Sequence, residues 1–161
     1  MALLFAVLTI SDRCSQGLMV DTAGPAVVDL LRGQWPSAQI DTGLVPDDED
    51  TITARLLEWT SIGTALILTV GGTGLSPRDR TPEATLHVID RYVPGLAEAM
   101  RTLGSQNNPF AWLSRGIAGM RGRSLIVNLP GSKRAAHENL SAILPLLRHA
   151  LEVAAGGQAH P

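Results

Sequence analysis

Four short runs of hydrophobic residues divide the chain, and they predict four β-strands. The runs cover residues 3–10, 38–45, 65–70 and 124–129, and the second run is the weakest. Three of the four are nearly continuous rather than alternating in polarity, which is typical of strands covered on both faces. The pattern therefore favours a parallel sheet within an α/β protein.

Signals for helix starts lie between and after these runs. They include Pro in a first turn, acidic residues near a helix start, and Ser, Thr or Asn as an N-cap. The predicted helices are 26–32, 51–59, one starting at Thr81 as N-cap, 108–117, and 133–153 with Ser132 as N-cap. Pro145 lies inside the last helix and should kink it or end its first half.

The resulting order is β-α-β-α-β, then three helices, then β-α. This alternation predicts a three-layer α/β/α sandwich with a mostly parallel central sheet. Residues 1–155 are expected to form a single domain, since 161 residues suit one ordinary domain and no repeat or linker is evident. Residues 156–161 are expected to form a disordered tail.

Composition narrows the classes of function. A net charge of -2 argues against a general nucleic-acid binder, although a few basic residues could still form a local anion site. No stretch reaches the roughly 20 apolar residues of a membrane span, and residues 1–10 suit a buried strand better than a secretion signal. Cys14 is the single cysteine, so no disulfide forms within the chain. The cytoplasm is the expected compartment.

The most informative segment follows the third predicted strand. Gly71, Gly72, Thr73 and Gly74 come directly after the strand, where glycine allows a sharp turn and a close approach of backbone to ligand. Neither a Walker loop nor a dinucleotide fingerprint fits, because Leu75 and Pro77 stand where those motifs need other residues. On the glycines alone, a simple tight turn remains an alternative to a phosphate-binding loop.

Charged residues after this loop strengthen the phosphate interpretation. Arg78 and Arg80 supply donors for phosphate, and Asp79 between them suits Mg²⁺, which takes carboxylates together with phosphate oxygens and water. A surface ion pair is the alternative for Asp79. Asp47 follows the second strand and offers a second carboxylate at the same sheet edge, although helix capping alone would also explain it.

The two remaining strand ends carry polar or small residues as well. Ser11 and Asp12 follow the first strand, and Pro130, Gly131 and Ser132 follow the last. Ligands of open α/β sheets bind outside the carboxyl ends of the strands. Four such loops at one edge therefore predict a cleft.

The sequence resembles the molybdopterin adenylyltransferase family, which includes the bacterial Mog-type proteins and the N-terminal domain of gephyrin. The resemblance runs in order from about residue 5 to residue 152. It is carried by segments 9–12, 21–25, 45–47, 71–85, 109–115, 118–122 and 128–131. Ala23 and Lys133 depart from residues common in the family, and these departures could alter ligand contacts without removing the carboxylates.

The resemblance implies a three-layer α/β/α fold, a homotrimer, and a reaction that joins molybdopterin and Mg-ATP into adenylyl-molybdopterin and pyrophosphate. Asp47 and Asp79 would be the catalytic and metal-binding carboxylates. Substrate binding is expected at Ser11, Asp12, Gly71, Gly72, Thr73, Gly74, Arg78, Ser114, Pro130, Gly131 and Ser132. A later hand-over of product to a molybdenum insertase is also implied. A molybdopterin-binding protein without transferase activity is the alternative.

Overall fold

A six-stranded, mostly parallel sheet forms the centre of the molecule. The structure, a computed structural model, describes residues 2–157, so most of the predicted tail lies outside the described residues. The strand order is β2-β1-β3-β6-β5-β4. The strands are β1 (Leu4–Ile10), β2 (Gln39–Val45), β3 (Leu66–Val70), β4 (Arg91–Tyr92), β5 (Ala118–Arg121) and β6 (Ser124–Leu129).

The four predicted strands are confirmed to within one residue at each end. They are β1, β2, β3 and β6, and they pair in parallel. The hydrophobic pattern missed β4 and β5. β5 pairs in antiparallel fashion with β6 on one side and with β4 on the other. β4 has only two residues and both are exposed, so it carries no hydrophobic signal of its own.

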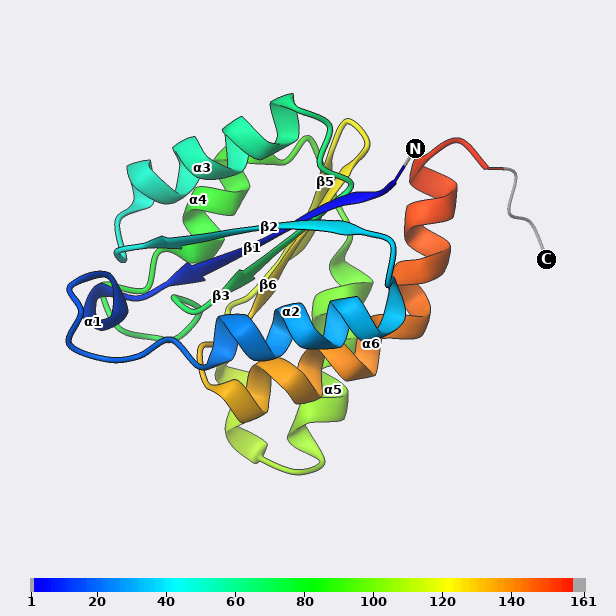
Figure 1. Ribbon diagram of the computed structural model, residues 1–161. Helices are drawn as coiled ribbons and strands as arrows, with labels where there is room; N and C mark the ends of the chain where they lie inside the picture. The colour runs from blue at the N-terminus through cyan, green and yellow to red at the C-terminus, as the bar shows by residue number, and fades with distance from the viewer. Residues whose placement is uncertain (1, 158–161) are drawn as a thin grey trace.

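Helices cover both faces of the sheet, which confirms the three-layer prediction (Figure 1). One face carries α2 (Ala23–Gln34), α5 (Pro94–Ser105) and α6 (Lys133–Ala154), and the other carries α3 (Glu49–Ser61) and α4 (Thr81–Val88). The short α1 (Asp12–Ser15) and the 3-10 helix η1 (Pro109–Leu113) complete the fold. Among residues 2–157, no helix is both long and apolar enough to cross a membrane.

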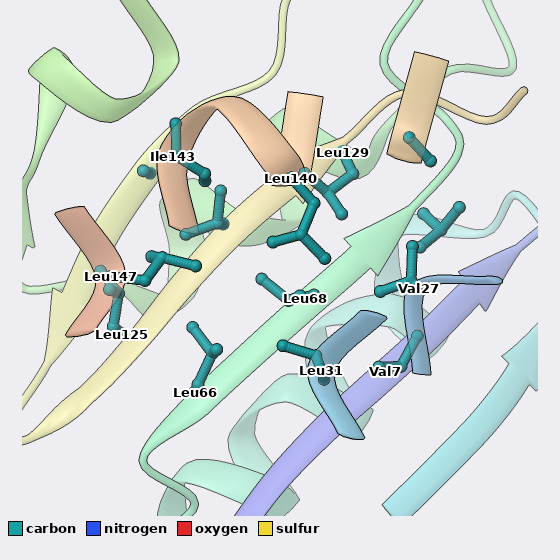
Figure 2. Packing of buried hydrophobic residues seen from close by; sticks show 14 of the residues in the cluster. Val7, Val27, Leu31, Leu66, Leu68, Leu125, Leu129, Leu140, Ile143 and Leu147 are labelled. Atoms are coloured by element: carbon teal, nitrogen blue, oxygen red, sulfur yellow. The ribbon is translucent and has the colours of Figure 1, made fainter. Parts of the chain in front are cut away.

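The strand side chains divide between two hydrophobic clusters. On β3, Leu66 and Leu68 face α2 and α6, whereas Ile67 belongs to the cluster under α3 and α4. Figure 2 shows the first cluster, with Leu31 and Leu140 reaching the sheet from the two helices. Burial on both faces explains the unbroken hydrophobic runs, and each fully buried side chain of this size contributes about 1.5–3 kcal/mol.

Two of the predicted helix starts need correction. Thr81 was expected to cap α4, but it is the first helical residue, and its hydroxyl donates a hydrogen bond to the Gly71 carbonyl. α2 begins at Ala23, three residues before the predicted start, with Pro25 still inside its first turn. The Thr81 side chain therefore connects the start of α4 to the glycine loop and does not cap the helix.

Other predicted helix features have mixed outcomes. The segment after Asn108 is a 3-10 helix that ends at Leu113, so the predicted helix to residue 117 was too long. Ser132 caps α6 as expected, and its hydroxyl accepts a hydrogen bond from the Ala135 amide. Pro145 lies inside α6, and Figure 1 shows this helix changing direction along its course. Pro145 therefore kinks α6 and does not end it.

Candidate functional site

The loops after β1, β2, β3 and β6 meet at one edge of the sheet. The register aligns the last residues of these strands, with Ile10 beside Val45, and Val70 beside Leu129. A cleft of about 730 Å³ opens at this edge. Its lining includes Asp79, Ser114 and segments 72–74 and 130–132, all of which belong to the predicted site.

The glycines after β3 have backbone conformations that a side chain would not tolerate. Gly71 and Gly72 have φ angles of +108° and +67°. A Cβ atom on Gly71 would lie 2.3 Å from the Ile10 carbonyl oxygen, and one on Gly72 would lie 2.2 Å from the Thr81 hydroxyl. These contacts explain why glycine occupies both positions.

The four carbonyls of residues 71–74 in this loop are all hydrogen-bonded. The carbonyls of Gly71 and Gly72 accept hydrogen bonds from the Thr81 hydroxyl and amide, at 2.9 and 3.1 Å. The next two carbonyls accept from Arg115, at 2.9 Å from its amide and 2.8 Å from its Nε. Within residues 2–157, the amides of 72–75 donate to no protein acceptor. Four consecutive unpaired N–H groups beside a cleft form an anion-binding strip.

Asp47 lies directly behind this strip. Its Oδ2 accepts a hydrogen bond from the Asp12 amide at 2.9 Å, while its Oδ1 lies 3.2 Å from the position that a Cβ on Gly72 would occupy. Burial raises the pKa of the Asp47 carboxyl above its ordinary value, and the hydrogen bond from Asp12 only partly offsets this rise. The charge of Asp79 raises the pKa of Asp47 further.

Asp79 lies at the other end of the same loop. Its Oδ2 accepts a hydrogen bond from the Ser76 amide at 3.0 Å and lies 2.8 Å from the position that a Cβ on Gly74 would occupy. In the described part of the chain, neither Asp79 nor Asp47 pairs with a basic side chain, and each keeps one oxygen without a hydrogen bond. Two unpaired carboxylates beside free amides suit a hard divalent cation bridged to an anion.

A donor set of this kind fits Mg²⁺ better than a metal that requires an all-protein cage. Among residues 2–157, no cluster of three or more His, Cys, Asp and Glu side chains is placed to hold a metal ion. Mg²⁺ usually binds through one or two carboxylates together with substrate phosphates and water. Asp47 and Asp79 match that requirement.

Asp12 and Arg78 lie next to the cleft rather than in its lining. Arg78 donates two hydrogen bonds to the Asp12 carboxylate, at 2.8 and 3.0 Å, and these bonds lower the pKa of Asp12. The Asp12 carboxylate also accepts from the Asp47 amide at 3.0 Å. Ser11 caps α1 by accepting from the Cys14 amide. These contacts link the loops after β1, β2 and β3.

The remaining predicted residues lie on two segments next to the glycine loop. The Ser114 hydroxyl lines the cleft and accepts a hydrogen bond from the Gly116 amide at 3.3 Å. On the β6 side, a Cβ on Gly131 would lie 3.2 Å from the Gly71 Cα, so the two glycine turns are in close contact. Pro130 and Ser132 flank this contact. The predicted residues thus gather at one edge of the sheet. Asp79, Ser114 and segments 72–74 and 130–132 line the cleft, whereas Ser11, Asp12, Asp47, Gly71 and Arg78 lie outside its lining.

Residues 6–149 match the family model described as "Probable molybdopterin binding domain". The chain belongs to this family. Molybdopterin adenylyltransferase from Helicobacter pylori strain J99 is 36% identical over 93% of this chain and 86% of its own length. The crystal structure of the molybdopterin biosynthesis enzyme MoaB from Thermus thermophilus shares 50% identity and a TM-score of 0.90, covering 96% and 97% of the two chains.

Some relatives in this molybdopterin-binding family are much longer. Gephyrin from Dictyostelium discoideum is 42% identical over 90% of this chain, which spans 21% of its length. The chain spans 25% and 47% of two further long relatives. The matched domain is therefore one part of those larger proteins.

Sequence reasoning missed several residues of this family member's cleft. Asn107, Glu138 and Asn139 line it from the segment after α5 and from α6, but nothing in their local sequence marks them. Arg115 lies within segment 109–115 and no role was predicted for it, yet it donates hydrogen bonds to two carbonyls of the glycine loop. Only the fold reveals such contacts, because Arg115 lies far along the chain from its partners.

Proposed function

We propose that this protein is a molybdopterin adenylyltransferase that uses ATP and Mg²⁺. The observation that supports this most directly is the strip of free amides at residues 72–75, with the unpaired carboxylates of Asp47 and Asp79 at its two ends. The strip suits a polyphosphate, and the carboxylates suit the cation that accompanies it. Relatives named molybdopterin adenylyltransferase support the choice of acceptor.

In the proposed reaction, a phosphate oxygen of molybdopterin attacks the α-phosphorus of ATP. A new P–O bond forms, the bond between the α-phosphorus and the bridging oxygen breaks, and pyrophosphate leaves. The attacking phosphate is already anionic, so no general base is needed. The task of the protein is to align the two substrates and to stabilise the charge that develops on the transferred phosphoryl group.

The residues of this chain divide that task. The amides of 72–75 would hold polyphosphate oxygens, and Arg78 would exchange its hydrogen bonds with Asp12 for bonds to phosphate. Asp47 and Asp79 would hold Mg²⁺, which when bound neutralises charge on the leaving pyrophosphate. Ser114 and the turn at 130–132, which lie next to the glycine loop, would receive molybdopterin.

Product analysis tests the proposal. The protein is incubated with molybdopterin, ATP and Mg²⁺, and adenylyl-molybdopterin and pyrophosphate should appear in equal amounts. Omitting any one component, or adding EDTA, should abolish both products. Binding of molybdopterin without release of pyrophosphate would instead identify a binding protein that lacks transferase activity.

The proposal extends to the setting of the reaction. The active form would be a homotrimer in the cytoplasm, and its product would pass to a molybdenum insertase. Sedimentation equilibrium should give three times the chain mass. A monomer that catalyses adenylyl transfer at the full rate would contradict the trimer without affecting the chemistry.

A further inference from the structure

We infer that Arg115, anchored by Glu83, is a positioning residue that orients the amides of the glycine loop and fixes the backbone at Asp79. This inference rests on the proposed function, because it assigns a role in binding the polyphosphate. Arg115 itself does not line the cleft. It would therefore act through the loop and not by touching substrate.

One residue binds three carbonyls of a single loop. The Arg115 amide donates to the Thr73 carbonyl at 2.9 Å, its Nε donates to the Gly74 carbonyl at 2.8 Å, and its Nη2 donates to the Asp79 carbonyl at 2.6 Å. Its Nη1 makes a salt bridge to the Glu83 carboxylate. The guanidinium thus joins both ends of the loop to the first turn of α4.

These bonds determine where the free amides point. In a trans peptide, the N–H of one residue points away from the carbonyl of the residue before it. No described peptide bond is cis. Because Arg115 holds the carbonyls of Thr73 and Gly74 on its own side, the amides of Gly74 and Leu75 point to the other side. Without Arg115, glycine at position 74 would let both peptide groups rotate.

The hydrogen bond from Arg115 to the Asp79 carbonyl also fixes the backbone at the proposed cation site. Asp79 supplies one of the two unpaired carboxylates, and Arg115 holds its carbonyl while Ser76 holds its side chain. A displacement of about 1 Å in a catalytic group can cost about a hundredfold in rate. The planar fork of arginine provides donors in fixed directions, which the single ammonium of lysine cannot reproduce.

Glu83 keeps the guanidinium in place. Its two carboxylate oxygens both face Arg115, and it lies in the first turn of α4, next to the Thr81 that binds the carbonyls of Gly71 and Gly72. The carbonyls of residues 71–74 are therefore all connected to the first turn of α4, two of them through Thr81 and two through Arg115 and Glu83. Glu83 should act on the loop through Arg115 and not independently of it.

The test compares Arg115→Gln, Arg115→Lys, Glu83→Gln and the double variant Glu83→Gln/Arg115→Gln with the wild type. Arg121→Gln is the matched control, since Arg121 also donates to a backbone carbonyl, that of Val88 at 2.8 Å, but away from the cleft. Two quantities are measured: kcat and KM for ATP in adenylyl transfer, and the Kd for inorganic pyrophosphate by calorimetry without metal. Thermal unfolding reports whether each variant folds.

Arg115→Gln should lower kcat/KM for ATP about a hundredfold and weaken pyrophosphate binding about tenfold, as expected for lost charged hydrogen bonds. Arg115→Lys should recover only part of either effect, and it carries the test if the glutamine variant does not fold. Glu83→Gln alone should lower kcat/KM for ATP about threefold. Added to Arg115→Gln in the double variant, it should cause no further loss, because the effects of coupled residues are not additive. Arg121→Gln should match the wild type.

Several results would overturn the inference. Values of kcat/KM and Kd within about twofold of wild type in both Arg115 variants would do so, as would effects of Glu83→Gln and Arg115→Gln that multiply. A wild type that binds no pyrophosphate would also reject it. A wild type that binds pyrophosphate but makes no adenylyl-molybdopterin would reject the proposed function alone, and the binding comparison would still decide the role of Arg115.

Discussion

Two groups of carboxylates lie near the same edge of the sheet, and they differ in their partners. Glu49 pairs with Arg80 at 2.7 Å and with His87 at 2.9 Å. Asp47 and Asp79 have no basic partner among the described residues and lie against the glycine loop. A carboxylate that has no basic side chain as a partner is therefore the better candidate for a ligand site.

The largest expected effect comes from Asp79→Asn. Removing a charge that positions the cation should lower the rate of adenylyl transfer by about 10²–10³, while the melting temperature stays unchanged because no salt bridge is lost. Pyrophosphate release and differential scanning fluorimetry measure the two quantities. Wild-type rates in this variant would remove Asp79 from the cation site.

Asp47→Asn should also abolish most of the activity, but with a different effect on stability. Because burial raises the pKa of Asp47 in the folded state, the folded protein loses stability as pH rises through that pKa. The asparagine variant avoids this loss, so its melting temperature should exceed that of the wild type at neutral pH. The difference should vanish below the ordinary aspartate pKa of 3.8, and a difference that persists there would contradict the explanation.

Arg78→Gln should have an intermediate effect on activity. Arg78 forms a salt bridge with Asp12 and is also predicted to bind phosphate. We expect KM for ATP to rise about tenfold, with a smaller change in kcat, as for a lost charged hydrogen bond to substrate. Steady-state kinetics over a range of ATP concentrations separates the two parameters. An unchanged KM would assign Arg78 to the ion pair alone.

Glu49→Gln should have the smallest effect and should leave adenylyl transfer within about twofold of wild type. The hydrogen bond from Arg80 lowers the pKa of Glu49, so the pair adds stability above the ordinary glutamate pKa and loses it as pH falls through the lowered pKa. The variant should therefore melt slightly below wild type at neutral pH and together with it in acid. At neutral pH this change in melting temperature has the opposite sign to that of Asp47→Asn. Melting curves recorded at neutral and at acidic pH measure both changes.

The sequence predicted most of the fold and the acidic half of the site. Runs buried on both faces identify the parallel strands, and the loops after such strands meet at one edge. Asp47 became a candidate because it follows β2 directly, and Asp79 because it lies between two arginines after the glycine loop. The catalytic roles of both remain predictions that the family resemblance implies. β5 was missed because it contains Gly119 and is stabilised by antiparallel pairing with β6 rather than by its own pattern. Arg115 was missed because its role depends on contacts distant in sequence.

The role of Thr81 could not be decided from the local sequence. Thr81 has the signature of an N-cap, whose hydroxyl accepts a hydrogen bond from a first-turn amide, but here Thr81 is the first helical residue and its hydroxyl donates to the Gly71 carbonyl. That carbonyl belongs to a loop whose path depends on two glycines with positive φ. Tertiary structure therefore decided between two uses of the same side chain.

The amides of residues 72–75 have a consequence for the range of conditions in which the protein can work. Main-chain N–H groups neither gain nor lose protons in water near neutrality, so this grip on an anion persists wherever the chain stays folded. The Asp47 carboxylate, which would help to hold the cation, has a pKa raised by burial. Acidification should therefore weaken cation retention through Asp47 while the amide donors stay unchanged, and Asp47 should set the lower pH limit of turnover.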